Sequence, residues 1–433
     1  MKKTNLEKLD LTLYEDVMNN GLRVFIVPKD NVNGVYATLS TKYGSNVNEF
    51  VPINDKKMVK VPLGIAHFLE HKMFEMKNGK DPFTFYSERG CDANANTSNI
   101  KTTYLFSGSN AFYENLDYLL DYVQSPYFTD ENVEKEKGII EQEIKMYDDV
   151  PYFKMYERLL YNSFINHPIK YPIAGTVEEI NKITKEDLYM CYNTFYNPAN
   201  MFLTIVGNVD VNETFNSIKV NQDDKTFDAF KEIKVKQIDE PDKVETEKET
   251  INMDIQIPKI GIAYKFNCSK LKKNINDIKS YLSILFEIKV GATSLLNERL
   301  KEQNLISSDI DFNLVNTDKH ILVSISVESK EYDKVIKEIE KELSDLNISS
   351  EDFERKKKIR KSGAIYRSDS IYSINNKIMN DIMKYDYVIT DDYKKIDELK
   401  YSYLKTIIKS IKFNNKSILI IEKSWFILKS SVY

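Results

Sequence analysis

The two halves of the chain repeat one order of predicted elements, and this repeat constrains the fold more than any other feature of the 433 residues. In the first half, strand-like segments precede a helix, a strand pair, an amphipathic helix and a further helix. The second half follows the same order from the segment PKIGIAYKF at residues 258–266. A repeated order of this kind indicates a duplicated domain that combines helices and strands.

Matched segments set the expected domain limits. Residues 129–137 (TDENVEKEK) match residues 349–357 (SSEDFERKK), and both halves close with a helix and a strand. We therefore predict an α+β fold of two homologous α/β-sandwich domains, each an antiparallel-rich sheet packed by helices. The domains are expected at residues 1–218 and 251–433. A charged segment with few apolar residues, 219–250, is expected to link them.

Composition excludes several classes of protein. A hydrophobic share of 42% is enough for sizeable cores, and a net charge of -5 lacks the basic character of a nucleic-acid-binding protein. No apolar run approaches about 18 residues, so no membrane span is expected. The segment MKKTNLEKLDLTLYED has no apolar run after its lysines, and Cys91, Cys191 and Cys268 have no paired spacing. These features predict a cytoplasmic protein whose partners include neither nucleic acid nor a membrane.

Two of the four histidines, His67 and His71, occur in the segment HFLEH. On a helix, side chains four positions apart lie about 40° apart around the axis, so both imidazoles can bind one metal ion. Glu70 lies between them and faces the same ion. The order His-x-x-Glu-His is the inverted form of a zinc-peptidase motif. Zinc needs at least one more protein ligand, and the scattered cysteines, with only His167 and His320 remaining, favour a carboxylate.

The helix predicted from residue 129 offers candidate carboxylates. Its apolar stripe should face the core and contains Val133, Ile140, Ile144 and Tyr147. Glu136 and Glu143 fall within this stripe, whereas Glu134 and Glu141 share a side that projects about 100° or more away from Ile140. Charged side chains on an apolar face are costly unless they are paired or bind a metal. Glu136 and Glu143 are therefore the candidates.

The second half lacks these groups. Lys356 stands opposite Glu136 and Gly363 stands opposite Glu143 in the matched helix, and that half has no histidine pair. The acidic pair therefore accompanies the histidines, as a metal site requires.

Several segments together resemble the insulinase/pitrilysin family of zinc peptidases. They are GIAHFLEHKMFE, DANANTSNIKTTYLF, EKEKGIIEQEI, HPIKYPIAGTVEEINKITKEDL and YNPANMFLTIVGNVD. Within the family the chain looks most like short bacterial members related to mitochondrial processing peptidase. The resemblance implies that His67, His71 and Glu143 bind one zinc ion, with a water in the fourth position. It also implies that Glu70 is the general base and that Glu136 supports the site without binding the metal.

The resemblance further implies a peptide substrate. Family members add the peptide as an extra strand at a sheet edge, and Asn94 and Ala95 match the segment that pairs with its backbone. An ordinary polar turn before a strand is the alternative for these two residues. The leading interpretation is a zinc-dependent endopeptidase that hydrolyses short or unfolded peptides. The alternatives are a non-catalytic subunit of the same fold and a protease dedicated to maturing one leader peptide.

One departure from the family predicts a partner. Complete family enzymes contribute an arginine and a tyrosine from the second half, but residues 294–312 have Lys301 and Ser307 near those places and no tyrosine. Arg299 lies two residues out of register. Either the register shifts, or the pair comes from a second chain. A homodimer, or a heterodimer with a homologous subunit that supplies the pair, is therefore expected.

Other residues carry no assigned chemistry. His167 precedes Pro168 and is expected to be structural, whereas His320 lies among polar residues and is expected to be exposed. Cys91 is expected to serve packing. Trp425 lies beyond the last recognisable strand and has no assigned role.

Overall fold

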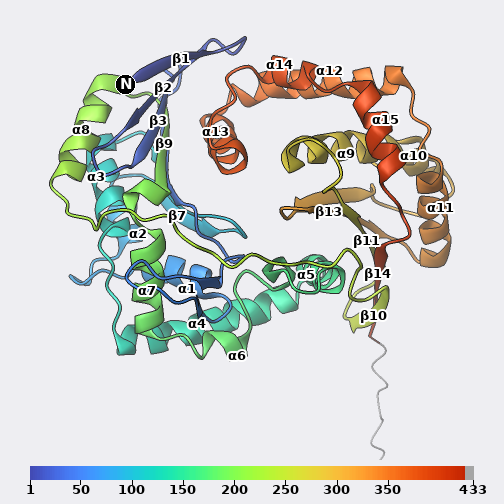
Figure 1. The fold of residues 1–433 in the computed structure, drawn as a ribbon, viewed down its shortest axis with the longest axis horizontal. Helices are drawn as coiled ribbons and strands as arrows, with labels where there is room; N and C mark the ends of the chain where they lie inside the picture. The colour runs from blue at the N-terminus through green and yellow to red at the C-terminus, as the bar shows by residue number, and fades with distance from the viewer. Residues whose placement is uncertain (425–433) are drawn as a thin grey trace, which may run out of the picture. The chain divides into compact units, whose positions relative to one another are not determined.

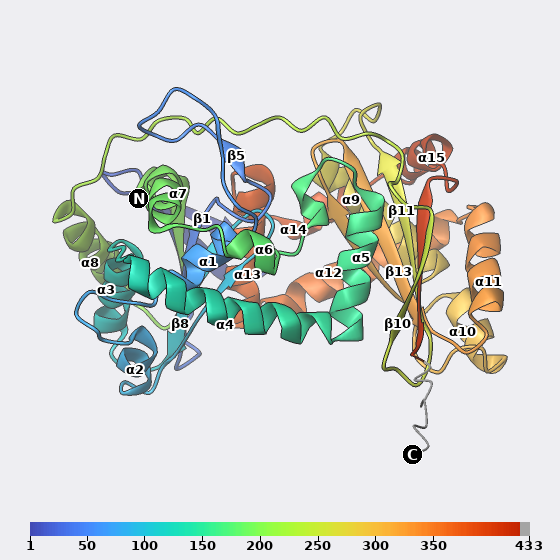
Figure 2. The ribbon, with the colours of Figure 1, turned by 90° about the horizontal axis from the view of Figure 1, so that it is seen from below.

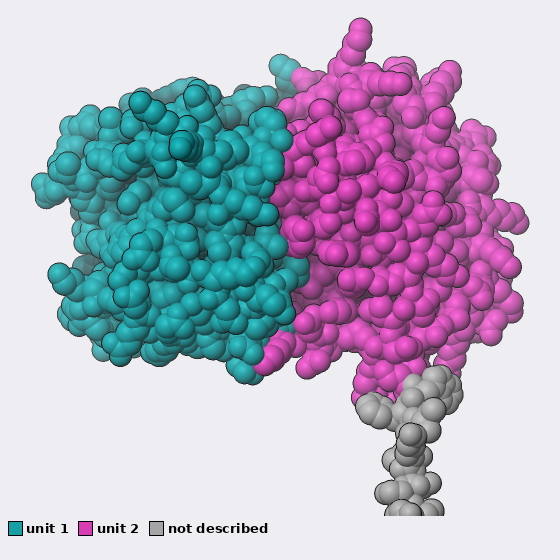
Figure 3. All heavy atoms as spheres, turned by 60° about the horizontal axis from the view of Figure 1, so that its bottom comes forward, with its two compact units in different colours: residues 1–144, 172–237, 361–396 teal, residues 145–171, 238–360, 397–433 magenta. Residues whose placement is uncertain are grey.

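The computed structural model describes residues 1–424, and Trp425 lies outside them (Figure 1). The chain forms two compact units, which Figure 3 colours separately. Unit 1 consists of residues 1–144, 172–237 and 361–396, and unit 2 consists of residues 145–171, 238–360 and those from 397 onward. Each unit is discontinuous, so each includes a segment from the opposite half of the chain.

Unit 1 contains a seven-stranded sheet. Its spatial order is β1 (Lys2–Leu6), β2 (Leu11–Val17), β3 (Arg23–Pro28), β9 (Met201–Gly207), β4 (Val35–Thr41), β8 (Thr102–Gly108) and β7 (Asp92–Thr97). β3 and β9 are parallel, and the other neighbouring strands are antiparallel. β7 is an edge strand, paired on one side with β8.

Unit 2 contains a five-stranded sheet. Its order is β10 (Lys248–Met253), β14 (Lys416–Lys423), β11 (Lys259–Asn267), β13 (His320–Glu328) and β12 (Asp311–Asn316). β10 and β14 are parallel, as β3 and β9 are in unit 1, and the remaining pairs are antiparallel. This order repeats the run from β3 to β7 in unit 1, strand for strand along the chain. The predicted α+β fold of two homologous, antiparallel-rich domains is confirmed.

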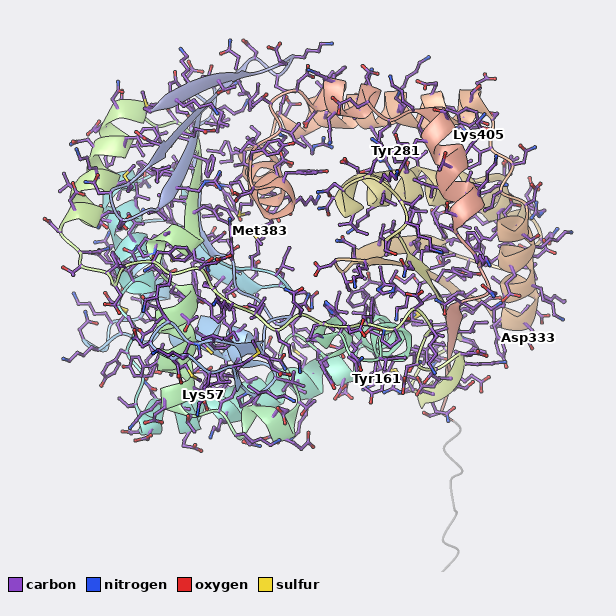
Figure 4. The ribbon with its side chains drawn as sticks, in the orientation of Figure 1. Lys57, Tyr161, Tyr281, Asp333, Met383 and Lys405 are labelled. Atoms are coloured by element: carbon purple, nitrogen blue, oxygen red, sulfur yellow. The ribbon has the colours of Figure 1, made fainter. Side chains whose placement is uncertain are left out.

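Helices cover both faces of the first sheet. On one face lie α1 (Ile65–Lys72), α3 (Phe112–Val123) and α7 (Lys185–Phe195), which share a buried core with that sheet. On the other face lies α13 (Ile371–Tyr385), whose Ile378 and Met379 pack with Phe25 and Phe202. Figure 4 labels Met383 near the end of this helix. Burial of each such side chain contributes about 1.5–3 kcal/mol, so the first-half sheet depends on a second-half helix.

The reverse exchange occurs in unit 2. α5 (Pro151–Ser163) comes from the first half and packs on β11, β13 and β14. A Cβ atom at Gly261 of β11 would lie 2.7 Å from Leu159 Cδ1, which explains a glycine inside a buried strand.

The remaining elements include α9 (Ile275–Lys289), which contributes to the core of unit 2. The other α-helices of the described chain are α2 Pro82–Ser87, α4 Asp130–Asp148, α6 Val177–Ile180, α8 Val211–Asp223, α10 Leu295–Glu302, α11 Tyr332–Ser344, α12 Ser350–Arg367, α14 Asp392–Asp397 and α15 Tyr401–Ser410. Two short strands, β5 (Glu49–Phe50) and β6 (Val59–Lys60), pair with each other. The segment predicted as a linker begins within α8 and ends within β10. Over residues 1–424, no helix combines the length and apolarity that a membrane span requires.

Two histidines lie in unit 2. His167 is structural, as predicted, because its Nδ1 accepts a hydrogen bond from the Ile169 amide at 3.1 Å. The predicted exposure of His320 is wrong: its exposed fraction is 1%. Asp242, from a distant loop, places its carboxylate 2.9 Å from His320 Nε2. The polar residues next to His320 in the sequence give no sign that Asp242 would contact and bury it. Cys91, Cys191 and Cys268 are buried and unpaired.

Candidate metal centre

The conformation of Gly64 sets the start of α1, the helix that carries the HFLEH segment. This residue has a φ of 85°, and a Cβ atom there would lie 2.3 Å from the Ala174 carbonyl oxygen. Ile65, Phe68 and Leu69 of the helix are buried in the core. The histidines are thus carried by a helix that packing holds rigidly in place.

α4 supplies the facing carboxylates. Thr129 caps this helix, since its Oγ1 accepts a hydrogen bond from the Asn132 amide at 3.1 Å. Val133 and Ile140 are buried, and this seven-residue spacing also places Glu136 and Glu143 toward α1. Figure 2 shows α4 running alongside α1.

The histidine and glutamate side chains converge on one point. His67 Nε2 lies 3.7 Å from Glu143 Oε1, and His71 Nε2 lies 3.4 Å from Glu143 Oε2. One donor atom from each of these residues lies within 4.8 Å of the others. Tetrahedral zinc ligands at about 2.1 Å from the ion are ~3.4 Å apart, so the spacing and the donor types fit zinc.

Glu136 connects a histidine to a buried lysine. Its Oε1 lies 3.0 Å from His71 Nδ1, and its Oε2 lies 3.7 Å from Lys72 Nζ. The fully buried Lys72 also pairs with Glu75 and donates to the Asn132 carbonyl. A carboxylate at Nδ1 favours the tautomer that leaves Nε2 free to bind a metal. Lys72 was not predicted as a site residue, although a charged residue directly after the second histidine is visible in the sequence.

Burial and neighbouring charges tune these groups in the metal-free protein. Burial, together with the charge of His71, lowers the pKa of His67 to about 4. Burial also lowers the pKa of His71, but hydrogen bonds to Glu136 and Glu143 outweigh it and raise that pKa to about 9. Burial raises the pKa of Glu70, against an opposing hydrogen bond from Thr97. At neutral pH, His67 is therefore neutral and His71 carries a proton.

A cavity of about 560 Å³ opens beside the cluster. Its lining includes Glu70, His71, Phe74, Phe83, Asn94, Ala95 and Glu136. Glu70 accepts a hydrogen bond from Thr97 Oγ1 at 2.6 Å. The structure thus brings all the predicted site residues together within unit 1, and it adds Thr97, which the sequence analysis had not singled out.

Comparisons with known proteins identify the family. The profile for Insulinase (Peptidase family M16) matches residues 60–177, and the profile for the Peptidase M16 inactive domain matches residues 182–360. An uncharacterized zinc protease of Bacillus subtilis, YmfH, is 42% identical over 365 residues, covering 83% of this chain and 85% of that protein. The chain belongs to the insulinase family, peptidase family M16. The predicted family is confirmed.

Solved structures of other proteins share the fold. An M16-like peptidase from Alicyclobacillus acidocaldarius has a TM-score of 0.91 at 29% identity, covering 97% of this chain and all of that one. A protease from Helicobacter pylori has a TM-score of 0.80 at 20% identity, covering 95% and 99% of the two chains. At that lower identity, the likeness shows the fold alone.

Zinc binding to this insulinase-family site should depend on pH. Because His71 holds a proton below about pH 9, zinc must displace it, whereas His67 is already neutral above about pH 4. The apparent association constant for zinc should rise about tenfold per pH unit between about pH 6 and pH 8. Calorimetric titration in buffers of different ionisation enthalpy should find about one proton released per zinc.

His167→Gln is the matched control, since it alters a half-buried histidine in unit 2 and should leave this slope unchanged. A zinc affinity that does not vary over the same pH range would contradict the assignment of His71.

Proposed function

We propose that this chain is a zinc-dependent endopeptidase that hydrolyses short or unfolded peptides with one zinc ion held by His67, His71 and Glu143. The observation that carries the proposal is Glu70, a buried carboxylate on the same helix as both histidines that lines the adjoining cavity. Relatives named zinc proteases support this class of activity. The alternative of a non-catalytic subunit has no use for a buried carboxylate at that position.

The side chains suit a hydrolytic mechanism. Bound zinc would acidify a water and polarise the peptide carbonyl. Glu70 accepts a proton from the attacking water and then gives it to the leaving amine. Burial raises the pKa of Glu70, which makes its carboxylate a stronger base than an exposed one. Glu136 holds His71 through Nδ1, which fixes the orientation of the imidazole.

The edge strand β7 is the proposed substrate platform. Asn94 and Ala95 lie on this strand, opposite Leu105 and Tyr104 of β8, and they line the cavity beside Glu70. The outer side of the strand can therefore pair with an extended peptide. Because backbone pairing requires free peptide groups, this mode favours short or unfolded substrates and imposes little sequence preference.

Replacing the base tests this proposal. Glu70→Gln keeps the size of the side chain but cannot accept a proton, so we expect kcat to fall by at least ~100-fold. Zinc content should stay unchanged, because Glu70 is not in the proposed ligand set. The measurement is cleavage of a mixture of unstructured peptides, followed by mass spectrometry, together with zinc analysis of the same samples.

Glu134→Gln is the matched control, since Glu134 is an exposed residue of α4 paired with Lys137. It should retain the full rate. A Glu70→Gln variant that remains fully active would refute the mechanism. A chain that binds no zinc and cleaves no peptide, with or without a partner, would favour the non-catalytic alternative.

We further propose that a second homologous chain completes the active site, as a homodimer or a heterodimer. In unit 2, the Arg299 guanidinium lies 3.3 Å from Glu338 and 3.6 Å from Glu342, and Lys301 pairs with Asp309. These cations are already engaged, and residues 294–312 contain no tyrosine. An arginine and tyrosine from a partner would supply the missing contacts to the substrate carbonyl.

A mixing experiment tests the partner. We expect the zinc-loaded chain to be slow alone and to gain activity when a homologous subunit is added. The rates should be compared with sedimentation measurements of the complex. If the monomeric chain alone reaches an ordinary enzymatic kcat of about 1–10³ s⁻¹, this proposal is wrong.

We also propose a cellular location for the chain. The three buried, unpaired cysteines support a cytoplasmic location.

A protease that matures one leader peptide remains the rival within the same class of enzyme, and a narrow cleavage pattern in the peptide mixture would distinguish it.

A further inference from the structure

We infer that Thr97 is a positioning residue, whose hydroxyl fixes Glu70 relative to the strand that carries the substrate. The inference rests on the proposed peptidase function, but it depends on a contact that involves neither the metal ligands nor Glu136. Thr97 is the last residue of β7, and Glu70 is on α1.

The contact is short and specific. Thr97 Oγ1 donates to Glu70 Oε2 across 2.6 Å. Within residues 1–424, Thr97 is the only hydrogen-bond partner of this carboxylate. Hydrogen bonds to ionised acceptors are shorter and stronger than neutral ones, so this bond is well suited to restrain the Glu70 side chain.

Neighbouring groups hold Thr97 in its role as a donor. Thr102 is its registered partner on β8, and the two hydroxyl oxygens are 3.3 Å apart. Thr102 gives its own proton to the Tyr43 carbonyl at 3.0 Å. A hydroxyl has a single proton to donate. An ionised carboxylate can only accept, and Glu70 Oε2, at 2.6 Å, is nearer to Thr97 Oγ1 than the Thr102 hydroxyl is. Thr97 therefore donates to Glu70, while the strand pairing fixes the Thr97 backbone.

The position of Thr97 along β7 connects two parts of the reaction. Side chains alternate along a strand, so Thr97 shares a face with Ala93 and Ala95, and both alanines pack against the core that includes α1. Ala95, which is expected to pair with substrate, is two residues away. The hydrogen bond from Thr97 to Glu70 therefore fixes the position of the base relative to a peptide that pairs with this strand. Errors of about 1 Å in such alignment can cost ~100-fold in rate.

Thr97→Val is the decisive variant, because it keeps the shape of the side chain and removes the hydroxyl. We expect kcat to fall about tenfold, since a base that is poorly oriented acts less often, whereas KM stays within about twofold. The backbone amide of Thr97, whose hydrogen bond also acts to lower the pKa of Glu70, stays in place in this variant, so activity should not be abolished. Thr97→Ser keeps the hydroxyl and should restore most of kcat. Zinc affinity should be unchanged in both variants.

Thr103→Val is the matched control. Thr103 is buried, whereas Thr97 is half-buried, and the Thr103 hydroxyl contacts Ser40 and Lys101 rather than Glu70. It should keep the kcat of the unmodified chain. The inference is overturned if Thr97→Val leaves kcat unchanged, if it raises KM alone, or if Thr97→Ser is impaired as much as Thr97→Val. The last outcome would assign the effect to packing.

Thermal unfolding of the metal-free chain tests the same bond without activity. Thr97→Val should lower the melting temperature by about 2–4 °C in the unmodified chain and by much less when Glu70 is already alanine. Equal shifts in both backgrounds would refute the contact. An unmodified chain that is inactive, or a Glu70→Gln variant that is fully active, would defeat the proposed function instead, so the two failures are distinguishable.

Discussion

The site in unit 1 depends on the contact between Glu143 of α4 and the two histidines of α1, His67 and His71. A carboxylate and two imidazoles in a mostly buried position are costly unless a proton or a metal ion is shared among them. In the metal-free protein, His71 takes up the proton. Glu70, Glu136 and Glu143 bring three carboxylates to this position, and Lys72, which lies 3.7 Å from Glu136, also pairs with Glu75. The cluster is therefore rich in acidic groups, which favours a divalent cation. The side chains thus form a site whose charge fits a metal ion as well as its spacing does.

The fold serves this site by fixing its parts from independent elements. Gly64 sets the start of the histidine helix, Thr129 caps the glutamate helix, and the edge strand β7 ends at Thr97 beside the base. α13, from the second half of the chain, covers the opposite face of the same sheet. Unit 1 is therefore built from both halves of the chain. In the corresponding helix of unit 2, Lys356 replaces Glu136 and hydrogen-bonds Thr293 at 2.9 Å, which agrees with the loss of metal chemistry there.

The sequence predicted what depends on local spacing and on the repeat. Two histidines four positions apart define a helical pair without any tertiary information. The apolar stripe of the next helix separated Glu136 and Glu143 from Glu134 and Glu141, and comparison of the two halves showed that only the first half carries the acidic pair. The contact of Thr97 with Glu70 could not be predicted, because it requires the end of a strand to meet a helix. The burial of His320 could not be predicted for a similar reason, since the residue that contacts it, Asp242, is distant in sequence. The sequence also did not predict that α5 packs on the sheet of unit 2 and α13 on the sheet of unit 1. Alternation and periodicity indicate which face of an element is apolar, but not which sheet packs against that face.

The central claim is that His67, His71 and Glu143 together hold a single metal ion. Anomalous X-ray diffraction from zinc-soaked crystals, recorded on both sides of the zinc absorption edge, tests it most directly. The account predicts one peak per chain, bonded to the Nε2 atoms of His67 and His71 and to the Glu143 carboxylate. The absence of a peak there, or a zinc ion bound by Glu136 in place of Glu143, would contradict it.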